Sequence, residues 1–185
     1  AGFDRAAFRA AAGLAPATTV LGYFGFLNAS KGGQLLLGAL EALRSAGRDA
    51  RLAMIGGAVG ASDPTNAATL AAFQASARAM GLAEAVLWTG HLPAPLVSAW
   101  LHAVDQVVLP YGDGASYRRG SLLAALVHGR SLVTTTPAPS PPGWQPGPDD
   151  ADPPPLVDGI HALLCPPDDA AALGARGVQP ADHAA

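Results

Sequence analysis

Five short and nearly continuous apolar segments alternate with segments of helical periodicity, and this alternation constrains the fold more than any other feature of the sequence. The apolar segments are residues 18–24, 51–55, 85–88, 106–109 and 131–135. The helical segments that separate them are residues 32–46, 65–80, 94–103 and 120–128. Strands that are apolar on both faces are typical of a parallel sheet whose crossover helices cover both sides. The sequence therefore predicts a doubly wound, Rossmann-like α/β fold with helices on both faces.

The chain divides into a leading segment, one domain and a tail. Residues 1–17 are expected to form a helix over 4–12 and a linker, with Gly13 ending the helix. Residues 18–176 are expected to form the domain, because 185 residues suit a single core. Residues 177–185 are expected to be a tail.

The end of the predicted domain is less regular. Residues 136–155 are rich in Pro, Gly, Ser and Asp, and they are expected to form an irregular loop. Residues 159–164 are expected to form a short last strand. Asp168 or Asp169 is expected to cap a final helix that stops near Gly174.

Charge and apolar patterning exclude two classes of partner. The net charge of −3 argues against a nucleic-acid surface, which needs a clustered excess of Lys and Arg. No apolar run reaches the roughly 18 residues that a transmembrane helix needs, and no secretory signal is recognised. The expected location is the cytoplasm, with peripheral association with the inner membrane face left open.

Metal-ligand and disulfide patterns are missing from the sequence. Cys165 is the single cysteine, and it is expected to be a buried small hydrophobe. No histidine pair has the spacing of a metal site. The histidines are His91, His102, His128, His161 and His183. We therefore expect no metal and no cofactor.

Lys31, the only lysine among 11 basic residues, lies in a glycine-rich loop that runs from Gly25 to Gly33 and opens a predicted helix. A cation at a helix N-terminus is unfavourable to the helix dipole, unless an anion is shared by the cation and the exposed backbone N–H groups. The loop therefore favours an anion-binding site at Lys31. The alternative is an exposed, solubilising lysine.

A second candidate for anion binding follows the fourth predicted strand. Arg118 and Arg119 directly precede a helix that begins with Gly120, Ser121 and Leu122. A phosphate there would meet guanidinium groups, free backbone N–H groups and a hydroxyl, and a charge-assisted hydrogen bond contributes about 1.5–3 kcal/mol. The alternative is that one arginine pairs with Asp113 or Asp105 while the other is exposed.

Several enzyme classes are disfavoured by the missing motifs. The sequence contains no Gly-x-x-x-x-Gly-Lys-Ser/Thr loop and no Gly-x-Gly-x-x-Gly, and no acidic residue ends the second predicted strand. ATP hydrolysis and dinucleotide-dependent dehydrogenation are therefore disfavoured. Ser116 and Ser121 lack a Gly-x-Ser-x-Gly elbow, which disfavours a hydrolase triad.

His91, after the third strand, is close enough to the predicted ligand edge to contact a base, although a loop histidine is also common as polar surface.

The segments of the predicted domain form an ordered series of short motifs. They are Tyr23-Phe24-Gly25, Lys31-Gly32, residues 52–57, residues 88–92, residues 103–110, residues 124–134 and Asp158-Gly159-Ile160-His161. In this order they resemble the C-terminal domain of the large retaining GT-B glycosyltransferase family, the group 1 glycosyl transferases. The resemblance extends from residue 18 to residue 173, and its specificity lies in the order of common pieces.

The resemblance implies that this domain binds a nucleoside-diphosphate sugar as its substrate. Gly25, Lys31 and the segment from Gly120 through Ser121 to Leu122 would bind the diphosphate and sugar. Thr89, His91, Leu92 and Ser116 would lie near the base and ribose. It also implies metal-independent, retaining transfer to an acceptor held by an N-terminal domain of the same protein. The domain alone would be inactive, and no catalytic residue is identified.

Two departures from the family pattern stand out. Phe26 occupies a position where the family often has arginine, and Ser116 and Ala124 occupy the positions of its paired glutamates. Our hypothesis is that Arg118 and Arg119 supply the missing positive charge. Two alternatives remain: a non-catalytic nucleotide- or partner-binding module of the same fold, and a nucleotide-sugar epimerase.

Overall fold

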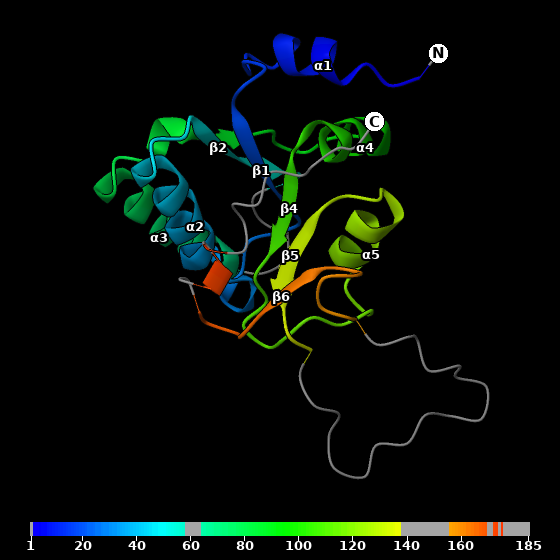
Figure 1. The fold of residues 1–185 in the computed structure, drawn as a ribbon. Helices are drawn as coiled ribbons and strands as arrows, with labels where there is room; N and C mark the ends of the chain where they lie inside the picture. The colour runs from blue at the N-terminus through cyan, green and yellow to red at the C-terminus, as the bar shows by residue number, and fades with distance from the viewer. Residues whose placement is uncertain (1, 58–63, 138–155, 170–171, 174, 176–185) are drawn as a thin grey trace, which may run out of the picture.

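Residues 2–57, 64–137, 156–169, 172–173 and 175 are described by a computed structural model of the chain. They form one parallel six-stranded sheet with the strand order β3-β2-β1-β4-β5-β6 (Figure 1). The strands are β1 (Thr19–Phe24), β2 (Ala50–Ile55), β3 (Val86–Trp88), β4 (Gln106–Leu109), β5 (Leu132–Thr135) and β6 (Leu163–Cys165). This confirms the predicted doubly wound α/β fold.

The helices lie on both faces of the sheet, with α2 and α3 on one side and α4 and α5 on the other (Figure 1). They are α1 (Arg5–Ala11), α2 (Gly33–Ser45), α3 (Pro64–Ala79), α4 (Ala94–Ala103) and α5 (Gly120–Val127), with short 3-10 turns at Ala29–Lys31 and Ala83–Ala85. Each helix, and each strand from β1 to β5, begins and ends within one residue of its predicted bounds.

Apolar packing on both sides of β1 and β4 forms the core. Val107, Val108 and Leu109 of β4 are buried, and so are four leucines on one face of α2. A Cβ atom on Gly22 of β1 would lie 2.9 Å from a methyl of Val104, so glycine is needed there for the α4–β4 connection to approach the sheet. The described helices include none with the length and hydropathy needed to cross a bilayer.

The leading helix α1 is tied to the amino edge of the sheet by a buried arginine. Arg9 is 4% exposed, and it donates to the Ala103 carbonyl at 3.0 Å, to the Thr18 carbonyl and to the Asp105 carboxylate. Asp105 also accepts the Val20 N–H at 2.7 Å. Burial alone would raise the pKa of Asp105, but the hydrogen bonds from Val20, Arg5 and Arg9 lower it overall. These bonds hold α1, β1 and β4 together.

The last strand begins later than the sequence predicts. Gly159 has a φ of +76° and lies in a turn between Asp158 and Ala162, so the strand forms only from Leu163. The Asp158 carboxylate accepts the Leu164 N–H at 2.8 Å and fixes this turn. A carboxylate that bonds nearby backbone favours a turn over a ladder.

Asp169 rather than Asp168 caps the helical residues that follow. Its carboxylate accepts the Ala172 N–H at 2.8 Å, whereas Asp168 adopts a φ of +60°. The predicted helix stop at Gly174, the tail 177–185 and all but the first two residues of the loop 136–155 lie outside the described residues.

Replacement of Gly32 tests how closely the loop after β1 packs on the loop after β4. Gly32 has a φ of +63°, and an added Cβ would lie 2.1 Å from the Pro110 carbonyl oxygen. Gly47 has a similar φ of +79° with nothing within 4 Å, so Gly47→Ala carries backbone strain alone, about 1–2 kcal/mol. We expect Gly32→Ala to lower the free energy of unfolding, measured by urea denaturation, at least twice as much as Gly47→Ala. Equal losses would contradict the close contact.

Candidate functional site

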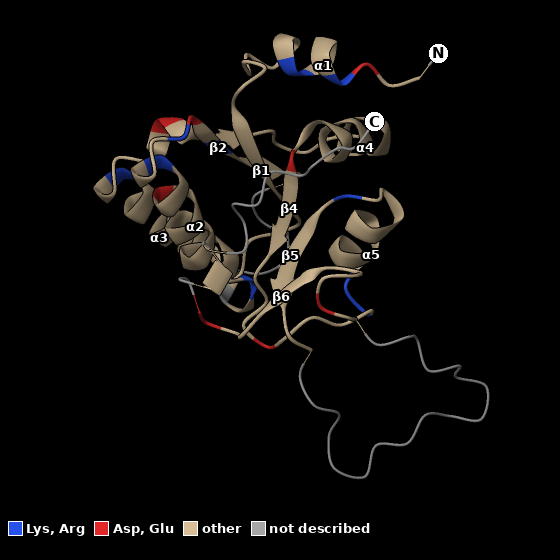
Figure 2. Ribbon diagram, in the orientation of Figure 1, with Lys and Arg blue, Asp and Glu red and all other residues tan. Residues whose placement is uncertain are grey.

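The site lies where β1 and β4 neighbour each other at the centre of the sheet. The chain leaves β1 towards α2 on one face and leaves β4 towards α5 on the other, so the two loops diverge and open a crevice at the carboxyl edge. The loops meet at its base, where the Gly112 N–H donates to the Ser30 carbonyl at 2.9 Å and Gly32 packs on Pro110. Figure 2 shows both basic and acidic segments near this edge of the sheet.

Lys31 and Arg119, predicted from separate loops, are brought to the same aromatic ring. The Lys31 Nζ lies 4.8 Å from the centroid of the Tyr111 ring, and the Arg119 guanidinium carbon lies 4.2 Å from it. Both are cation–π contacts, and the ring that receives them is buried. Tyr111 therefore fixes the positions of both cations.

Arg119 also forms an ion pair with Asp113, whereas Arg118 is exposed. This arrangement matches one expectation for the arginine pair, that one would meet Asp113 and the other would be exposed. Asp105 pairs with Arg5 and Arg9 instead. The ion pair does not remove Arg119 from the site, because its guanidinium still lies over Tyr111 beside Lys31.

Positive charge is in excess at this cluster, which contains two cations and one carboxylate. Burial lowers the pKa of Lys31, and the nearby Arg119 lowers it further, while Asp113 opposes the shift. The Nε of Arg119 is buried and has no hydrogen-bond partner among the described residues. An anion bound here would relieve the repulsion and satisfy a buried donor.

The N-terminus of α5 completes the cluster. Arg119 is the N-cap and its side chain does not cap the helix, so the backbone N–H groups of Gly120, Ser121 and Leu122 have no partner within the helix. The Ser121 Oγ lies 2.7 Å from the Tyr111 hydroxyl. The positive end of the helix dipole therefore points to the same place as the two cations.

Gly25 adjoins this helix end from the neighbouring strand. An added Cβ at Gly25 would lie 3.9 Å from the Cβ of Ser121. The side chain of Leu122 is fully buried, so only its backbone is available to a ligand. Gly25, Lys31, Arg119 and Ser121 are thus gathered at one place at the carboxyl edge of the sheet, and the exposed Arg118 precedes Arg119 in the chain.

A largely apolar cavity of about 460 Å³ adjoins Gly25 and runs between α4 and α5. Of the residues predicted near a base, His91 and Leu92 line this cavity. Thr89 does not, because its hydroxyl accepts the Gly56 N–H at 3.0 Å and joins the ends of β2 and β3. The other lining residues are Phe24, Gly25, Phe26, Gly56, Gly57, Ala94, Val97, Ser98, Leu101, Ala124 and His128.

Ser116 and Ala124, the positions of the family's glutamates, have different surroundings. Ala124 lines the cavity, whereas the Ser116 Oγ accepts the Arg118 N–H at 3.3 Å within the loop. No described lining residue is acidic, and the described part of the chain contains no cluster of acidic, histidine or cysteine residues that would hold a metal. The cavity therefore suits a neutral, partly apolar group.

Tyr111, Ser98 and His128 belong to the site but were missed by the sequence reasoning. Tyr111 had a detectable signal, since it is an aromatic residue two positions after a buried strand at the predicted ligand edge. His128 lies four residues after Ala124 and shares its helix face, a spacing that the sequence displays. Ser98 gave no signal, because its role depends on how α4 and α5 pack together.

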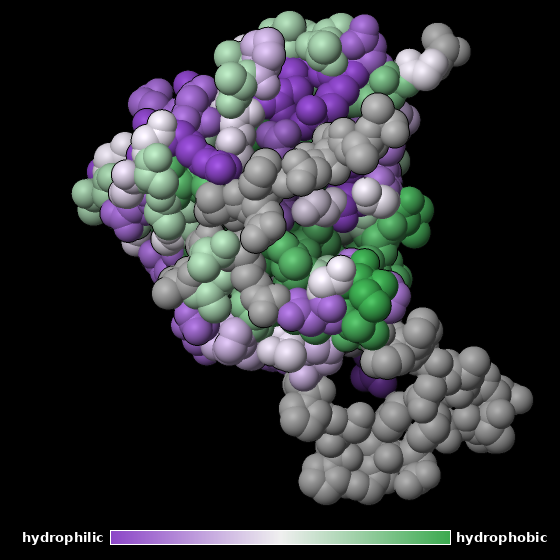
Figure 3. Space-filling model, in the orientation of Figure 1, coloured by the Kyte–Doolittle hydropathy of each residue, from purple (hydrophilic) through white to green (hydrophobic). Residues whose placement is uncertain are grey.

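Helix α5 is apolar on its exposed outer side as well as on its buried side. Leu123 is 42% exposed and Val127 is 83% exposed, and Figure 3 shows hydrophobic surface over this helix. Phe26 at the mouth of the cavity is 51% exposed. An apolar surface on both sides of a helix is typical of a helix that other parts of a protein cover on both sides.

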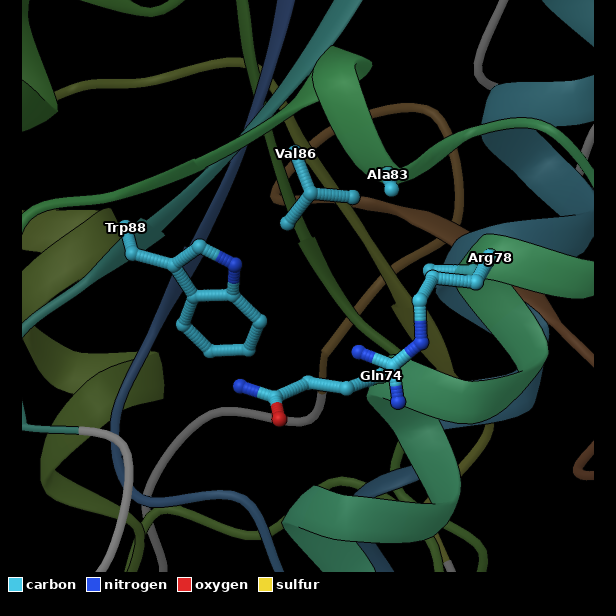
Figure 4. Close-up of a pocket in the computed structure, with 6 residues that line it drawn as sticks. Gln74, Arg78, Ala83, Val86 and Trp88 are labelled. Atoms are coloured by element: carbon cyan, nitrogen blue, oxygen red, sulfur yellow. The ribbon is translucent and has the colours of Figure 1, made fainter.

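A second, smaller hollow of about 160 Å³ lies against the edge strand β3 and helix α3. Figure 4 shows Gln74 and Arg78 of α3 and Trp88 of β3 lining it from two sides. It shares no lining residue with the larger cavity, and β3 is two strands away from β1. It is therefore separate from the cation cluster.

One family model matches most of the chain. The model is described as Glycosyl transferases group 1, and it matches residues 18–179. None of the curated proteins matches the sequence significantly.

Solved structures show the same fold. HepE of Anabaena in complex with UDP-glucose has a TM-score of 0.72 at 17% identity, covering 95% of this chain and 42% of that one. The C-terminal domain of LpcC from Francisella tularensis, a glycosyl transferase group 1 family protein, has a TM-score of 0.68 at 16% identity, covering 94% and 80%. Sucrose-phosphate synthase from Thermosynechococcus elongatus has a TM-score of 0.67 at 20% identity, covering 92% and 38%. The chain thus spans less than half the length of HepE.

The electrostatic coupling at Tyr111 is testable through the single lysine of the chain. Arg119→Ala removes a neighbouring cation and frees Asp113 to face Lys31, so we expect the pKa of Lys31 to rise towards its ordinary value. NMR titration of protein labelled at lysine side chains measures this pKa directly. Arg118→Ala also removes one positive charge, but from the exposed residue that precedes Arg119. We expect it to leave the pKa of Lys31 nearly unchanged. An equal rise in both variants would contradict the arrangement.

Proposed function

This chain belongs to the glycosyl transferases group 1 family, and from that membership we propose that it binds the diphosphate of a nucleoside-diphosphate sugar at Lys31, Arg119 and the N-terminus of α5. The observation that carries the proposal is the meeting of both cations on Tyr111 beside Ser121. Structures of the similar HepE with UDP and with UDP-glucose support the choice of ligand.

The nucleoside would occupy the apolar cavity next to Gly25. A diphosphate at Ser121 has its nucleoside attached directly, and the cavity is the adjoining space large enough to receive it. His91 and Leu92 would lie against the nucleoside. Apolar lining with few polar groups is typical of sites that bury a base and fix its orientation by a small number of hydrogen bonds.

The proposed reaction is transfer of the sugar to a hydroxyl of an acceptor. The bond between the sugar's anomeric carbon and the diphosphate oxygen breaks, a bond from that carbon to the acceptor oxygen forms, and the acceptor's proton is released. Lys31, Arg119 and the α5 dipole stabilise the negative charge that develops on the leaving diphosphate, which is the role a metal ion has in other transferases. We propose retention of anomeric configuration and no metal.

A second domain of the whole protein would bind the acceptor. The chain spans 42% of the length of HepE, so a protein of that size has room for another domain. The apolar outer side of α5 and the exposed Phe26 lie beside the cavity and are suited to contact with it. On this proposal the present chain forms one wall of the cleft in which transfer occurs.

A second candidate is a nucleotide-binding module without transferase activity. It is favoured by two observations: no described residue that lines the cavity is acidic, and Ala124 occupies a glutamate position of the family. Donor hydrolysis or transfer by the full-length protein distinguishes the two candidates. Turnover of a nucleotide sugar would support the transferase, and binding without turnover would support the module.

Calorimetric titration with UDP, GDP, ADP and their sugar conjugates tests donor binding. We expect one nucleotide to bind, and both Lys31→Ala and Arg119→Ala to weaken it about 10- to 100-fold, since each removes a charge-assisted hydrogen bond of about 1.5–3 kcal/mol. Arg118→Ala should weaken binding less, because its side chain is exposed at the margin of the site.

Arg78→Ala is the control for loss of one positive charge, since Arg78 lies on α3 beside the smaller hollow. We expect it to leave nucleotide affinity unchanged. No binding by any nucleotide, or equal loss in Arg78→Ala and Arg119→Ala, would refute the proposed diphosphate site.

A further inference from the structure

Two polar side chains face each other across the cavity between α4 and α5. The Ser98 Oγ of α4 lies 2.9 Å from the Nε2 of His128, which follows the last turn of α5. The Nδ1 of the same histidine lies 2.7 Å from the Ala124 carbonyl oxygen. Both Ser98 and His128 line the cavity.

These two contacts determine the direction of the hydrogen bond between Ser98 and His128. A carbonyl oxygen only accepts, so the Nδ1 of His128 must carry the proton that bonds to Ala124. In the neutral ring the Nε2 is then an acceptor, and the Ser98 hydroxyl donates to it. The hydrogen of Ser98 is occupied, and the lone pairs of its oxygen are available to accept a hydrogen bond.

This acceptor is placed in apolar surroundings. The side chains of Phe24, Leu92, Val97 and Leu101 line the same cavity, and His91, at an exposed position, has the only other polar side chain among its described lining residues. A polar group of a ligand that enters such a cavity loses its water and needs a partner there. Ser98 offers that partner to a ligand hydroxyl.

The pair lies within reach of a group attached to a bound diphosphate. Gly25 adjoins Ser121 and also lines the cavity, so the anion cluster and the cavity are continuous. Along α5 the rise is about 1.5 Å per residue, so Ala124 lies about 4.5 Å and His128 about 10 Å beyond Ser121. The first group reached from the diphosphate of a nucleotide is its ribose.

We propose that the Ser98–His128 pair accepts a hydrogen bond from a ribose hydroxyl of the bound nucleotide, and so makes the cavity selective for ribonucleotides. Ser98 contacts the ribose, and His128 is a positioning residue that orients the Ser98 hydroxyl. The inference rests on the proposed donor site, because it takes the diphosphate to be bound at Ser121.

The test changes the protein and the ligand together. We would titrate the 185-residue chain with inorganic pyrophosphate, with UDP, GDP and ADP, and with the 2′,3′-dideoxy counterpart of each nucleotide. The expected result is that the chain binds one ribonucleotide about 10-fold more tightly than its dideoxy counterpart, as one well-placed hydrogen bond allows. Ser98→Ala should abolish this preference and leave pyrophosphate affinity unchanged.

Two further variants separate a specific effect from a structural one. His128→Gln should reduce the ribose preference without reducing affinity for the dideoxy nucleotide, an effect that general loss of packing would not produce. Ser76→Ala makes the same substitution on α3, where Ser76 bonds Gln34 outside the cavity, and should retain the preference.

The outcomes are distinct for the two proposals. Tight nucleotide binding whose ribose preference survives Ser98→Ala would overturn the Ser98–His128 inference and leave the diphosphate site standing. Equal loss of affinity for the ribo and dideoxy forms in Ser98→Ala would also overturn the inference. Failure of pyrophosphate and of every nucleotide to bind would overturn both.

Discussion

The contact between the loop after β1 and the loop after β4 determines where the functional groups of this protein lie. Gly32 takes a left-handed conformation against the Pro110 carbonyl, and the Gly112 N–H donates to Ser30. These contacts place Lys31, which lies between them in the chain, over the ring of Tyr111. A side chain at position 32 would separate the loops, and the Lys31 side chain would no longer lie beside Arg119 over the Tyr111 ring. Backbone packing thus determines the electrostatics of the site.

The site combines a small charged part with a larger apolar part. Lys31, Arg119 and the start of α5 provide positive charge at the edge of the sheet, and the cavity between α4 and α5 provides volume without acidic groups. Charge attracts and orients a phosphate at long range, whereas apolar lining and a few hydrogen bonds select the group attached to it. The two parts meet at Gly25, where the missing side chain leaves room for a ligand to pass from one to the other.

The order of the elements could be predicted from the sequence because each strand is a short apolar run that a glycine, a proline or a helical pattern ends. The last strand was misplaced because residues 159–162 form a turn fixed by Asp158, a local side-chain bond that apolar patterning does not report. The places of Lys31 and Arg119 at the carboxyl edge of the sheet could be predicted because each lies in a loop between a strand and the start of the next helix. Their meeting on Tyr111, and the pairing of Ser98 with His128, depend on contacts between elements far apart in the sequence.

The buried Arg9 holds the opposite edge of the sheet, where it joins α1 to the beginnings of β1 and β4. Because this anchorage lies far from the ligand edge, sequence change in the loops after β1 and β4 need not weaken it. Such a separation permits evolutionary divergence at the ligand edge, where Phe26, Ser116 and Ala124 depart from the family pattern while the sheet keeps its strand order. Low identity to proteins of the same fold is the consequence expected of a scaffold whose Arg9 anchorage and whose candidate site lie at opposite edges of the sheet.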